Sequence, residues 1–330
     1  MIEKAQIIGT GSYLPERVLT NSDLEKMVET SDEWILTRTG IKERRIARSD
    51  EFTSHMGANA ARAAIADAGL VPDQIDFIIV ATLSPDFIFP STACLIQHAI
   101  GAKRAGAVDI AAACTGFIYA LSMAKAFVET GVYKNVLVIA AEKLSSITNY
   151  KDRATCVLFG DGAAACVVSR EKKGLSIEIV KLGADGEQAE LLMLPAGGCR
   201  TPASVDTVAN DQHYIKMAGN EVFKHAVRRM EAACKDCLDE VNIQEDQISW
   251  VIPHQANMRI IDAIAKRFET LPPERVYKTV RKYGNTSASS LGIALDELLR
   301  GHKVVSGEQI LLTAFGSGFT WGAAVLKVER

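Results

Sequence analysis

Apolar segments alternate with amphipathic segments along most of the chain, and this alternation predicts its secondary structure. Short apolar runs, expected to be buried strands, read IDFIIVA, AVDIAA, NVLVIAA and AACVVS in the first half and ISWVIP, QILLTAF and AAVLKV in the second. Apolar residues recur at helical spacing near 55–69, 114–130, 217–240, 255–268 and 288–300. Apolar strands that alternate with helices indicate an α/β fold whose sheet is covered on both faces.

The two halves of the chain resemble each other. PDQIDFIIV at 72–80 is similar to EDQISWVIP at 245–253, and DGAAACVV is similar to WGAAVLKV later in the chain. The two pairs occur in the same order and at similar separations, which favours a duplicated α/β unit over chance similarity of apolar strands. We expect an N-terminal half over 1–175 and a C-terminal half over 176–330, joined near the polar segment SREKKGLS.

Composition and charge exclude several broad classes. Of the 330 residues, 48% are hydrophobic and 23% are charged, which is ordinary for a globular protein. The net charge of −3 gives no general attraction to nucleic acid or to an anionic membrane. No apolar run approaches the ~18–20 residues of a membrane span. The first residues, MIEKAQIIGTGSYLPER, lack the layout of a signal peptide, so we expect a cytoplasmic protein.

The cysteines point to neither a disulfide framework nor a metal site. There are seven, an odd number in a long chain. Cys234 and Cys237 form a CxxC pair inside an amphipathic segment, and no second pair of ligands follows at a spacing suited to zinc. We therefore expect this pair to be structural and expect no metal.

Three residues that could carry chemistry each stand at a predicted turn before a helix. Cys114 follows an apolar run from Val108 to Ala113, expected to be a buried strand, and precedes a helical pattern. A thiol at a helix N-terminus has a lowered pKa and is a ready nucleophile. His254 in PHQAN also follows a predicted strand and precedes a helical segment, and Asn285 in YGNTS lies in a turn ahead of another helix. Singly they could be an inert cysteine, a core histidine and a helix cap, but ligands of α/β sheets bind at the carboxyl ends of strands, where all three could converge.

A glycine-rich turn could complete such a site. In AFGSGFTWGAA, Ser317 stands between two glycines after a predicted strand. A turn of this kind can present backbone N–H groups to a developing oxyanion, or it can be a simple connection between two strands. The residues alone leave both readings open.

Seven segments together resemble the β-ketoacyl-acyl carrier protein synthase III family of the thiolase superfamily. The resemblance covers nearly the whole chain and is carried by SDEWILTRTGI, ACTGF, FGDGAAA, KMAGNEVFK, PHQAN, YGNTS and GFTWGAA, in the order of the family. It implies a thiolase-like, five-layered αβαβα fold built from two similar halves, and a homodimer.

The resemblance also implies a reaction without a cofactor. Cys114 would take an acyl group from acyl-CoA, with acetyl-CoA as the expected primer, and malonyl-acyl carrier protein would then bind. His254 and Asn285 would donate hydrogen bonds to the malonyl thioester as carbon dioxide leaves, and the carbanion would attack the acyl-cysteine, initiating fatty acid biosynthesis. The backbone N–H groups of Cys114 and Ser317 would hold the oxyanion. Relatives commonly carry a third glycine where Ser317 stands.

Further residues match substrate-binding positions of the family. Trp34 and Arg153 match the pair that encloses the CoA adenine, Arg38 matches a residue near the CoA phosphates, and Asn257 matches one that lines the tunnel. Phe89 matches the residue that reaches across the dimer and closes the acyl pocket of the other subunit. The plain alternatives are core aromatic residues and solvated surface charges.

Carrier proteins are acidic, so a local basic surface is expected despite the negative net charge. Lys224 and Arg228 are four residues apart in one helical pattern. Arg259 and Lys266 are seven apart in another, with Arg267 beside the latter. We expect these residues to dock the carrier, with Arg259 as the strongest candidate, although charges on helices are often only solvated.

Other functions remain open at this point. A related condensing enzyme or acyltransferase of secondary metabolism would share the Cys-His-Asn set and use another primer or extender. A papain-like protease has the same residue order, but the CGSC stretch of that class is missing here. A binding protein without activity would have no need of all three side chains together.

Overall fold

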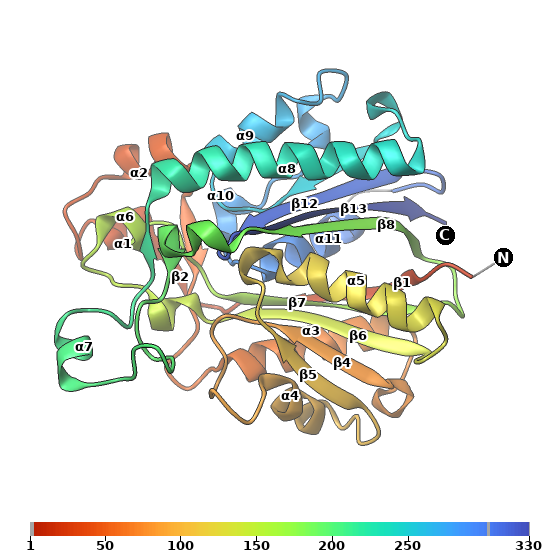
Figure 1. Cartoon of the computed structure of the whole chain (residues 1–330), viewed down its shortest axis with the longest axis horizontal. Coiled ribbons are helices and arrows are strands. Elements are labelled where there is room, and N and C mark those ends of the chain that lie inside the picture. The colour runs from red at the N-terminus through yellow and green to blue at the C-terminus, as the bar shows by residue number, and fades with distance from the viewer. Residues whose placement is uncertain (1–2, 302–303, 330) are drawn as a thin grey trace.

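The computed structural model describes residues 3–301 and 304–329, which form a large mixed sheet covered by helices (Figure 1). Its nine strands follow the order β11-β12-β13-β8-β1-β7-β6-β4-β5. These strands are β1 (Gln6–Tyr13), β4 (Phe77–Ala81), β5 (Gly106–Ile110), β6 (Asn135–Glu142), β7 (Gly162–Ser169), β8 (Leu175–Ala184), β11 (Trp250–Pro253), β12 (Gln309–Gly316) and β13 (Thr320–Val328).

The pairing pattern on one side of the sheet is repeated on the other. β1 pairs antiparallel with β7, β7 antiparallel with β6, and β6 parallel with β4. In the same way, β8 pairs antiparallel with β13, β13 antiparallel with β12, and β12 parallel with β11. The two parts meet through a short antiparallel contact between β1 and β8. The repetition agrees with the similarity between the two halves of the sequence.

Helices form three layers, one between the two parts of the sheet and one on each outer side (Figure 1). α3 and α4 cover the part that contains β4 to β7, α8 and α9 cover the part that contains β11 to β13, and α5 and α11 lie between the two. The longer helices are α2 (Asp32–Thr39), α3 (Thr53–Asp67), α4 (Thr92–Ile100), α5 (Gly116–Glu129), α8 (Gly219–Val241), α9 (Met258–Ala265) and α11 (Ser289–Gly301).

Three hydrophobic clusters correspond to the three helical layers. Met56 of α3 belongs to the first cluster, Phe117 of α5 to the second, and Met230 of α8 to the third, and all three side chains are fully or almost fully buried. Each cluster excludes water from one helix–sheet interface, which supplies the main stabilisation of a layered fold. The five layers αβαβα follow from this arrangement.

Shorter elements connect the layers. They are β2 (Val18–Thr20), β3 (Glu43–Arg45), β9 (Leu192–Met193), β10 (Lys216–Met217), α1 (Asn21–Leu24), α6 (Arg153–Cys156), α7 (Val205–Ala209) and α10 (Val280–Tyr283). Among the described residues, no helix is both long and apolar enough to cross a membrane.

The predicted helices and apolar strands are present, but one predicted strand differs. The run from Val108 to Ala113 is not a buried strand: β5 ends at Ile110, lies at the edge of the sheet, and has exposed or half-buried residues. β7 ends at Ser169 and β8 begins at Leu175, so the predicted division between residues 175 and 176 falls at the start of β8. The division into two halves at this point stays a prediction.

Candidate active site

Cys114 lies on a tight turn between β5 and α5. A single 3₁₀ turn, Ala113–Thr115, leads directly into α5, and Ala113 has a φ of 47°, a left-handed conformation that is costly for a residue with a side chain. The hydroxyl of Thr115 donates to the carbonyl of Ala112 at 2.5 Å and holds the turn closed. The predicted position at a strand-to-helix junction is therefore correct, and the side chain is buried.

The turn between β12 and β13 packs against Cys114. A Cβ atom on Gly316 would lie 2.7 Å from the backbone nitrogen of Cys114, so only glycine allows this approach. Ser317, the next residue, lines the same cavity as Cys114, and its hydroxyl donates to the carbonyl of Leu192. The serine side chain is thus directed to the β9 strand.

His254 follows β11 and is held on two sides. Its backbone N–H donates to the carbonyl of Thr313 on β12 at 2.7 Å. On the ring, Nδ1 lies 2.7 Å from the hydroxyl oxygen of Ser290, on α11. Burial lowers the pKa of His254 to about 3, so the ring is neutral at physiological pH.

Asn285 lies in the turn between α10 and α11. Its backbone is fastened to the segment before β7, because its N–H donates to the carbonyl of Leu158 and its carbonyl accepts from Gly160. Its side-chain oxygen accepts from the backbone N–H of Ser287 at 2.8 Å. That bond occupies the amide oxygen and leaves the amide NH₂ group as the donor.

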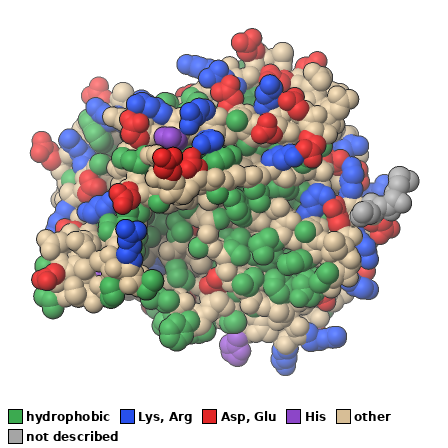
Figure 2. Space-filling model, viewed as in Figure 1, with side chains coloured by type: hydrophobic (Ala, Val, Ile, Leu, Met, Phe, Trp, Pro, Cys, Tyr) green, Lys and Arg blue, Asp and Glu red, His purple; other side chains and the backbone are tan. Residues whose placement is uncertain are grey.

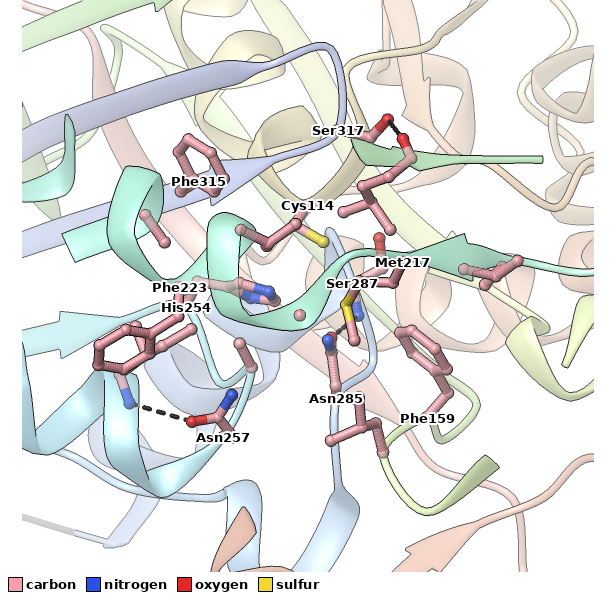
Figure 3. A pocket seen from close by; sticks show the side chains of 18 of the residues that line it. Cys114, Phe159, Met217, Phe223, His254, Asn257, Asn285, Ser287, Phe315 and Ser317 are labelled. Carbon is pink, nitrogen blue, oxygen red and sulfur yellow. Dashed lines mark hydrogen bonds between the residues drawn. The ribbon is translucent and has the colours of Figure 1, made fainter. Parts of the chain in front are cut away.

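One cavity of about 480 Å³ joins these residues. Cys114, His254, Asn285 and Ser317 all line it, and Figure 3 shows the first three side chains around a common space. The other walls are mostly apolar. They include Leu144, Leu158, Phe159, Leu192, Met217, Phe223 and Phe315. The cavity is suited to an apolar chain that ends at a small group of polar atoms.

The pKa of the candidate nucleophile differs from the expectation. A helix N-terminus predicted a lowered value, whereas burial raises the pKa of Cys114 to about 12. The Ser287 hydroxyl lowers it and the carboxylate of Glu142 raises it, both by less than burial does. The resting sulfur is therefore a thiol, and it must lose its proton when it reacts.

Three polar residues next to the site were not predicted. They are Ser290, which contacts His254, Ser287, which lines the cavity, and Glu142, which is fully buried at the end of β6. The two serines belong to the segment GNTSASS, whose density of hydroxyl groups before a helix was the available signal. Glu142 ends an otherwise apolar run, and a carboxylate that follows such a strand was a signal too.

The residues expected to bind CoA meet at one end of the cavity. Trp34 and Arg38, both on α2, line it, and Arg38 is exposed to solvent. The guanidinium carbons of Arg38 and Arg153 lie 4.8 Å and 4.7 Å from the centre of the Trp34 ring, within the range of cation–π contacts. The cavity therefore connects the partly buried Trp34 ring and the exposed Arg38 with the buried Cys114.

Asn257 and Phe89 have different surroundings. Asn257 lines the cavity and caps α9, since its side-chain oxygen accepts from the backbone N–H of Ile260 at 3.0 Å. Phe89 does not line the cavity of its own chain. It lies with Phe87 and Ile88 on an exposed loop after β4, and its side chain is 84% exposed.

Some of the basic residues expected to dock the carrier form salt bridges with acidic residues of this chain. Lys224 pairs with Glu221 at 2.8 Å, and Arg267 pairs with Glu231 at 3.2 Å. Lys266 caps the C-terminal end of α9. Arg259 lines the cavity and lies 5.2 Å above the ring of Phe223. Of these residues, Arg259 is the one directly at the cavity.

Cys234 and Cys237 are buried on α8, where burial raises the pKa of each thiol to about 12. Within the described ranges, no three His, Cys, Asp or Glu side chains are grouped so as to hold a metal ion. The candidate site consists of one thiol, one neutral imidazole, one amide and nearby hydroxyl and backbone groups.

Comparisons with known proteins identify the family of this chain. The family described as 3-oxoacyl-[acyl-carrier-protein] synthase III matches residues 108–186, and its C-terminal counterpart matches residues 238–328. A β-ketoacyl-[acyl-carrier-protein] synthase III from Chlamydia muridarum is 63% identical over 98% of this chain and 99% of its own. A relative of the same name from Caldanaerobacter subterraneus is 55% identical, with full coverage of both chains.

A solved structure supports the same assignment. The 3-oxoacyl-[acyl-carrier-protein] synthase III from Aquifex aeolicus is 51% identical, superimposes with a TM-score of 0.90, and the match covers 98% of this chain and 99% of that one. The predicted thiolase-like fold is thereby confirmed. The site geometry, the family matches and the structural similarity agree: the chain belongs to the β-ketoacyl-acyl carrier protein synthase III family of condensing enzymes.

Proposed function

We propose that this protein condenses an acyl-CoA primer with malonyl-acyl carrier protein and releases carbon dioxide and CoA. The observation that carries the proposal is the convergence of Cys114, His254 and Asn285 in one cavity that begins at Trp34 and Arg38. Cys114 follows β5 and His254 follows β11, while Asn285 lies in the turn between α10 and α11. The family to which the chain belongs is named for this class of product.

In the first half of the reaction, Cys114 attacks the thioester of acyl-CoA. Trp34, Arg38 and Arg153 bind the nucleotide part of CoA, and the pantetheine arm follows the cavity past Asn257 to the sulfur. The acyl chain then lies against apolar walls. The backbone N–H groups of Cys114 and Ser317 stabilise the oxyanion, which is supported by the close packing of Gly316 on Cys114.

In the second half, malonyl-acyl carrier protein replaces CoA. The neutral ring of His254 and the NH₂ group of Asn285 donate hydrogen bonds to the thioester oxygen, where negative charge develops as carbon dioxide leaves. The resulting carbanion attacks the acyl-cysteine. The reaction proposed here uses no cofactor, because fixed donors meet each developing charge and both thioesters are substrates.

We include a homodimer in the proposal. β5 is an edge strand, and Figure 2 shows hydrophobic side chains gathered around it and around α5. The exposed Phe87, Ile88 and Phe89 follow in the loop after β4. A second copy that pairs along β5 would cover this surface and bring its Phe89 towards the acyl end of the cavity. Phe89→Asp should yield monomers in light scattering, and a dimer that persists would contradict this arrangement.

Arg259 is proposed as the main contact of the acidic carrier, with Lys224, Lys266 and Arg267 in support. Its position at the cavity supports this role, since the carrier must deliver its malonyl group there. The cytoplasmic location predicted from the sequence belongs to the same proposal.

The full reaction tests the proposal. Purified protein, acetyl-CoA and malonyl-acyl carrier protein should give a carrier whose mass corresponds to acetoacetyl loading, together with carbon dioxide. Other primers, including branched and longer acyl-CoAs, identify the preferred substrate in the same assay. Product with another primer or extender alone would favour the related condensing enzymes of secondary metabolism, and no product with any pair would contradict the proposal.

A further inference from the structure

Behind Cys114 lie two buried polar groups that face each other. Glu142 is fully buried, and one of its carboxylate oxygens, Oε2, accepts from the hydroxyl of Ser84 at 2.7 Å, the backbone N–H of Leu83 at 3.0 Å and the hydroxyl of Thr82 at 3.3 Å. The other oxygen, Oε1, has no hydrogen-bond partner within the described residues. An unpartnered carboxylate oxygen in a protein interior is costly and calls for an explanation.

Ser287 stands between this carboxylate and the cysteine. Its side chain is buried, lines the cavity, and lacks a hydrogen bond of good geometry within the described part of the chain. It nevertheless lies close enough to the sulfur of Cys114 and to the carboxylate of Glu142 to lower the pKa of both groups. Ser287 has a φ of 51°, so the backbone accepts strain to keep the hydroxyl in this place.

The resting thiol requires a proton acceptor, and His254 is a poor one. Burial raises the pKa of Cys114 to about 12 and lowers the pKa of His254 to about 3. Burial raises the pKa of Glu142 to about 7, and its hydrogen-bond donors oppose this shift. An acceptor transfers protons best when its pKa lies near the operating pH.

Among the described residues, Glu142 forms no salt bridge, and its known neighbours are neutral groups. The loop after β4 presents Thr82, Ser84 and the backbone N–H of Leu83, and the turn before α11 presents Ser287. Cys114 is the titratable group that faces Glu142 from the turn before α5. Lys143, the next residue in the chain, directs its ammonium group instead to the carbonyls of Arg48 and Glu51.

We infer that Glu142 accepts the proton of the Cys114 thiol through the hydroxyl of Ser287 and later returns it. This inference rests on the proposed function, because it concerns the acylation of Cys114. Ser287 contacts the reacting sulfur, whereas Glu142 acts through Ser287. Neither residue replaces His254 and Asn285, which serve the decarboxylation.

The proton that leaves Cys114 in the first half-reaction returns to it in the second. During acylation, the bond from Sγ to the acyl carbon forms and the bond from that carbon to the CoA sulfur breaks. The thiol proton passes to Ser287 while the Ser287 proton passes to Glu142, and the CoA thiolate takes a proton from water. During condensation, the bond from Sγ to the acyl carbon breaks, and the cysteine thiolate takes back the proton from Glu142 by the same route. One proton is consumed per turnover, as decarboxylation of a carboxylate requires.

The test is the rate of acyl-enzyme formation against pH, followed by quenched-flow mass spectrometry with acetyl-CoA. The natural protein should show a rate that rises with pH and levels off above a pKa of about 7. Glu142→Gln keeps the shape of the side chain and should lower the rate at pH 8 by roughly 10²-fold, the lower end of what a general base contributes. Its profile should lose the inflection, and Glu142→Asp should restore it in part.

A Ser287→Ala variant and the decarboxylation of malonyl-acyl carrier protein provide two further tests of the proton route. Ser287→Ala should reproduce the loss, and the double variant should be no slower than either single variant, since both interrupt one route. Decarboxylation of malonyl-acyl carrier protein should stay within about threefold in Glu142→Gln, because fixed donors of other residues serve it.

The possible failures are distinguishable. An unchanged inflection in Glu142→Gln, or additive losses in the double variant, would overturn the proton route. Parallel loss of acylation and decarboxylation would show a structural role for Glu142 and would also overturn it. If the natural protein forms no acyl-enzyme at all, the proposed function fails instead.

Discussion

The hydroxyl oxygen of Ser290 lies 2.7 Å from Nδ1 of His254. The same oxygen accepts from the backbone N–H of Gln255 at 3.3 Å, so the serine hydrogen is available for the imidazole nitrogen. A ring that accepts at Nδ1 carries its proton on Nε2. In this arrangement, a serine on α11 makes His254 a donor towards the cavity without charging it.

Ser290→Ala should impair the step that needs this donor. Without the hydroxyl, the proton of the ring can move to Nδ1, and Nε2 then no longer donates. The rate of decarboxylation of malonyl-acyl carrier protein should therefore fall by roughly 10- to 100-fold. This loss is smaller than the ~10²–10³-fold loss of rate expected when a donor is removed outright. Acylation of Cys114 should stay within about threefold. Radiolabelled carbon dioxide and intact-protein mass measure the two steps separately, and an equal loss in both would contradict this role.

Glu142 should make stability depend on pH in a particular direction. Its pKa in the folded protein is raised from 4.5 to about 7, so its contribution to stability is complete below pH 4.5 and is lost as pH rises towards 7. At about 1.4 kcal/mol per pKa unit, this loss is on the order of 3 kcal/mol.

Glu142→Gln cannot ionise, so its unfolding temperature should rise relative to the natural protein between pH 4.5 and 7 and then stay level. Calorimetry of both proteins across this range measures the difference. The exchange of carboxylate for amide is also expected to shift the unfolding temperature by the same amount at every pH. This shift does not change how the difference in unfolding temperature depends on pH. A difference that shrinks as pH rises would contradict the burial of an ionisable Glu142.

Trp34→Ala should weaken binding of the nucleotide part of CoA. Loss of an aromatic ring that contacts two guanidinium groups is expected to cost about 0.5–2 kcal/mol, which corresponds to a twofold to thirtyfold rise in KM for acyl-CoA. The acyl thioester of N-acetylcysteamine has no adenosine and serves as the matched substrate. Its KM should be the same for both proteins, and a rise for this substrate as well would assign Trp34 a structural role.

Arg259→Glu should separate the two substrates. Charge reversal at the cavity should raise the KM for malonyl-acyl carrier protein by roughly tenfold, or about 1.4 kcal/mol, while acylation by acyl-CoA stays unchanged. Arg62→Glu, on α3 in the opposite outer layer, is the matched control, and it should alter neither step. If Arg259→Glu slows acylation to the same extent as condensation, Arg259 does not dock the carrier.

Much of the layered fold could be predicted from the sequence, because buried strands and amphipathic helices leave clear apolar patterns. The strand β1 was not predicted from the sequence, for a physical reason. Gly9 and Gly11 replace apolar side chains where α3 presses on the strand, and a Cβ atom at Gly9 would lie 2.4 Å from the backbone nitrogen of Ala68. β5 was predicted as buried because edge position is not encoded in an apolar run.

The site was predictable only in part, for a similar reason. Cys114, His254 and Asn285 occur in recognisable segments, and the structure brings them together in one cavity. The surroundings that set their chemistry come from distant segments. Ser290 reaches His254 across 36 positions, and Glu142 approaches Cys114 from the end of β6, which is separated from β5 by β4. Burial raises the pKa of Cys114, which a local pattern cannot show.

The most direct test of the central claim is the intact mass of the protein after incubation with a panel of acyl-CoAs, from acetyl to octanoyl and including branched primers. The account predicts a gain of one acyl group on the natural protein and no gain on Cys114→Ala. A gain that persists in Cys114→Ala, or no gain on the natural protein with any primer, would contradict the assignment of Cys114 as the nucleophile.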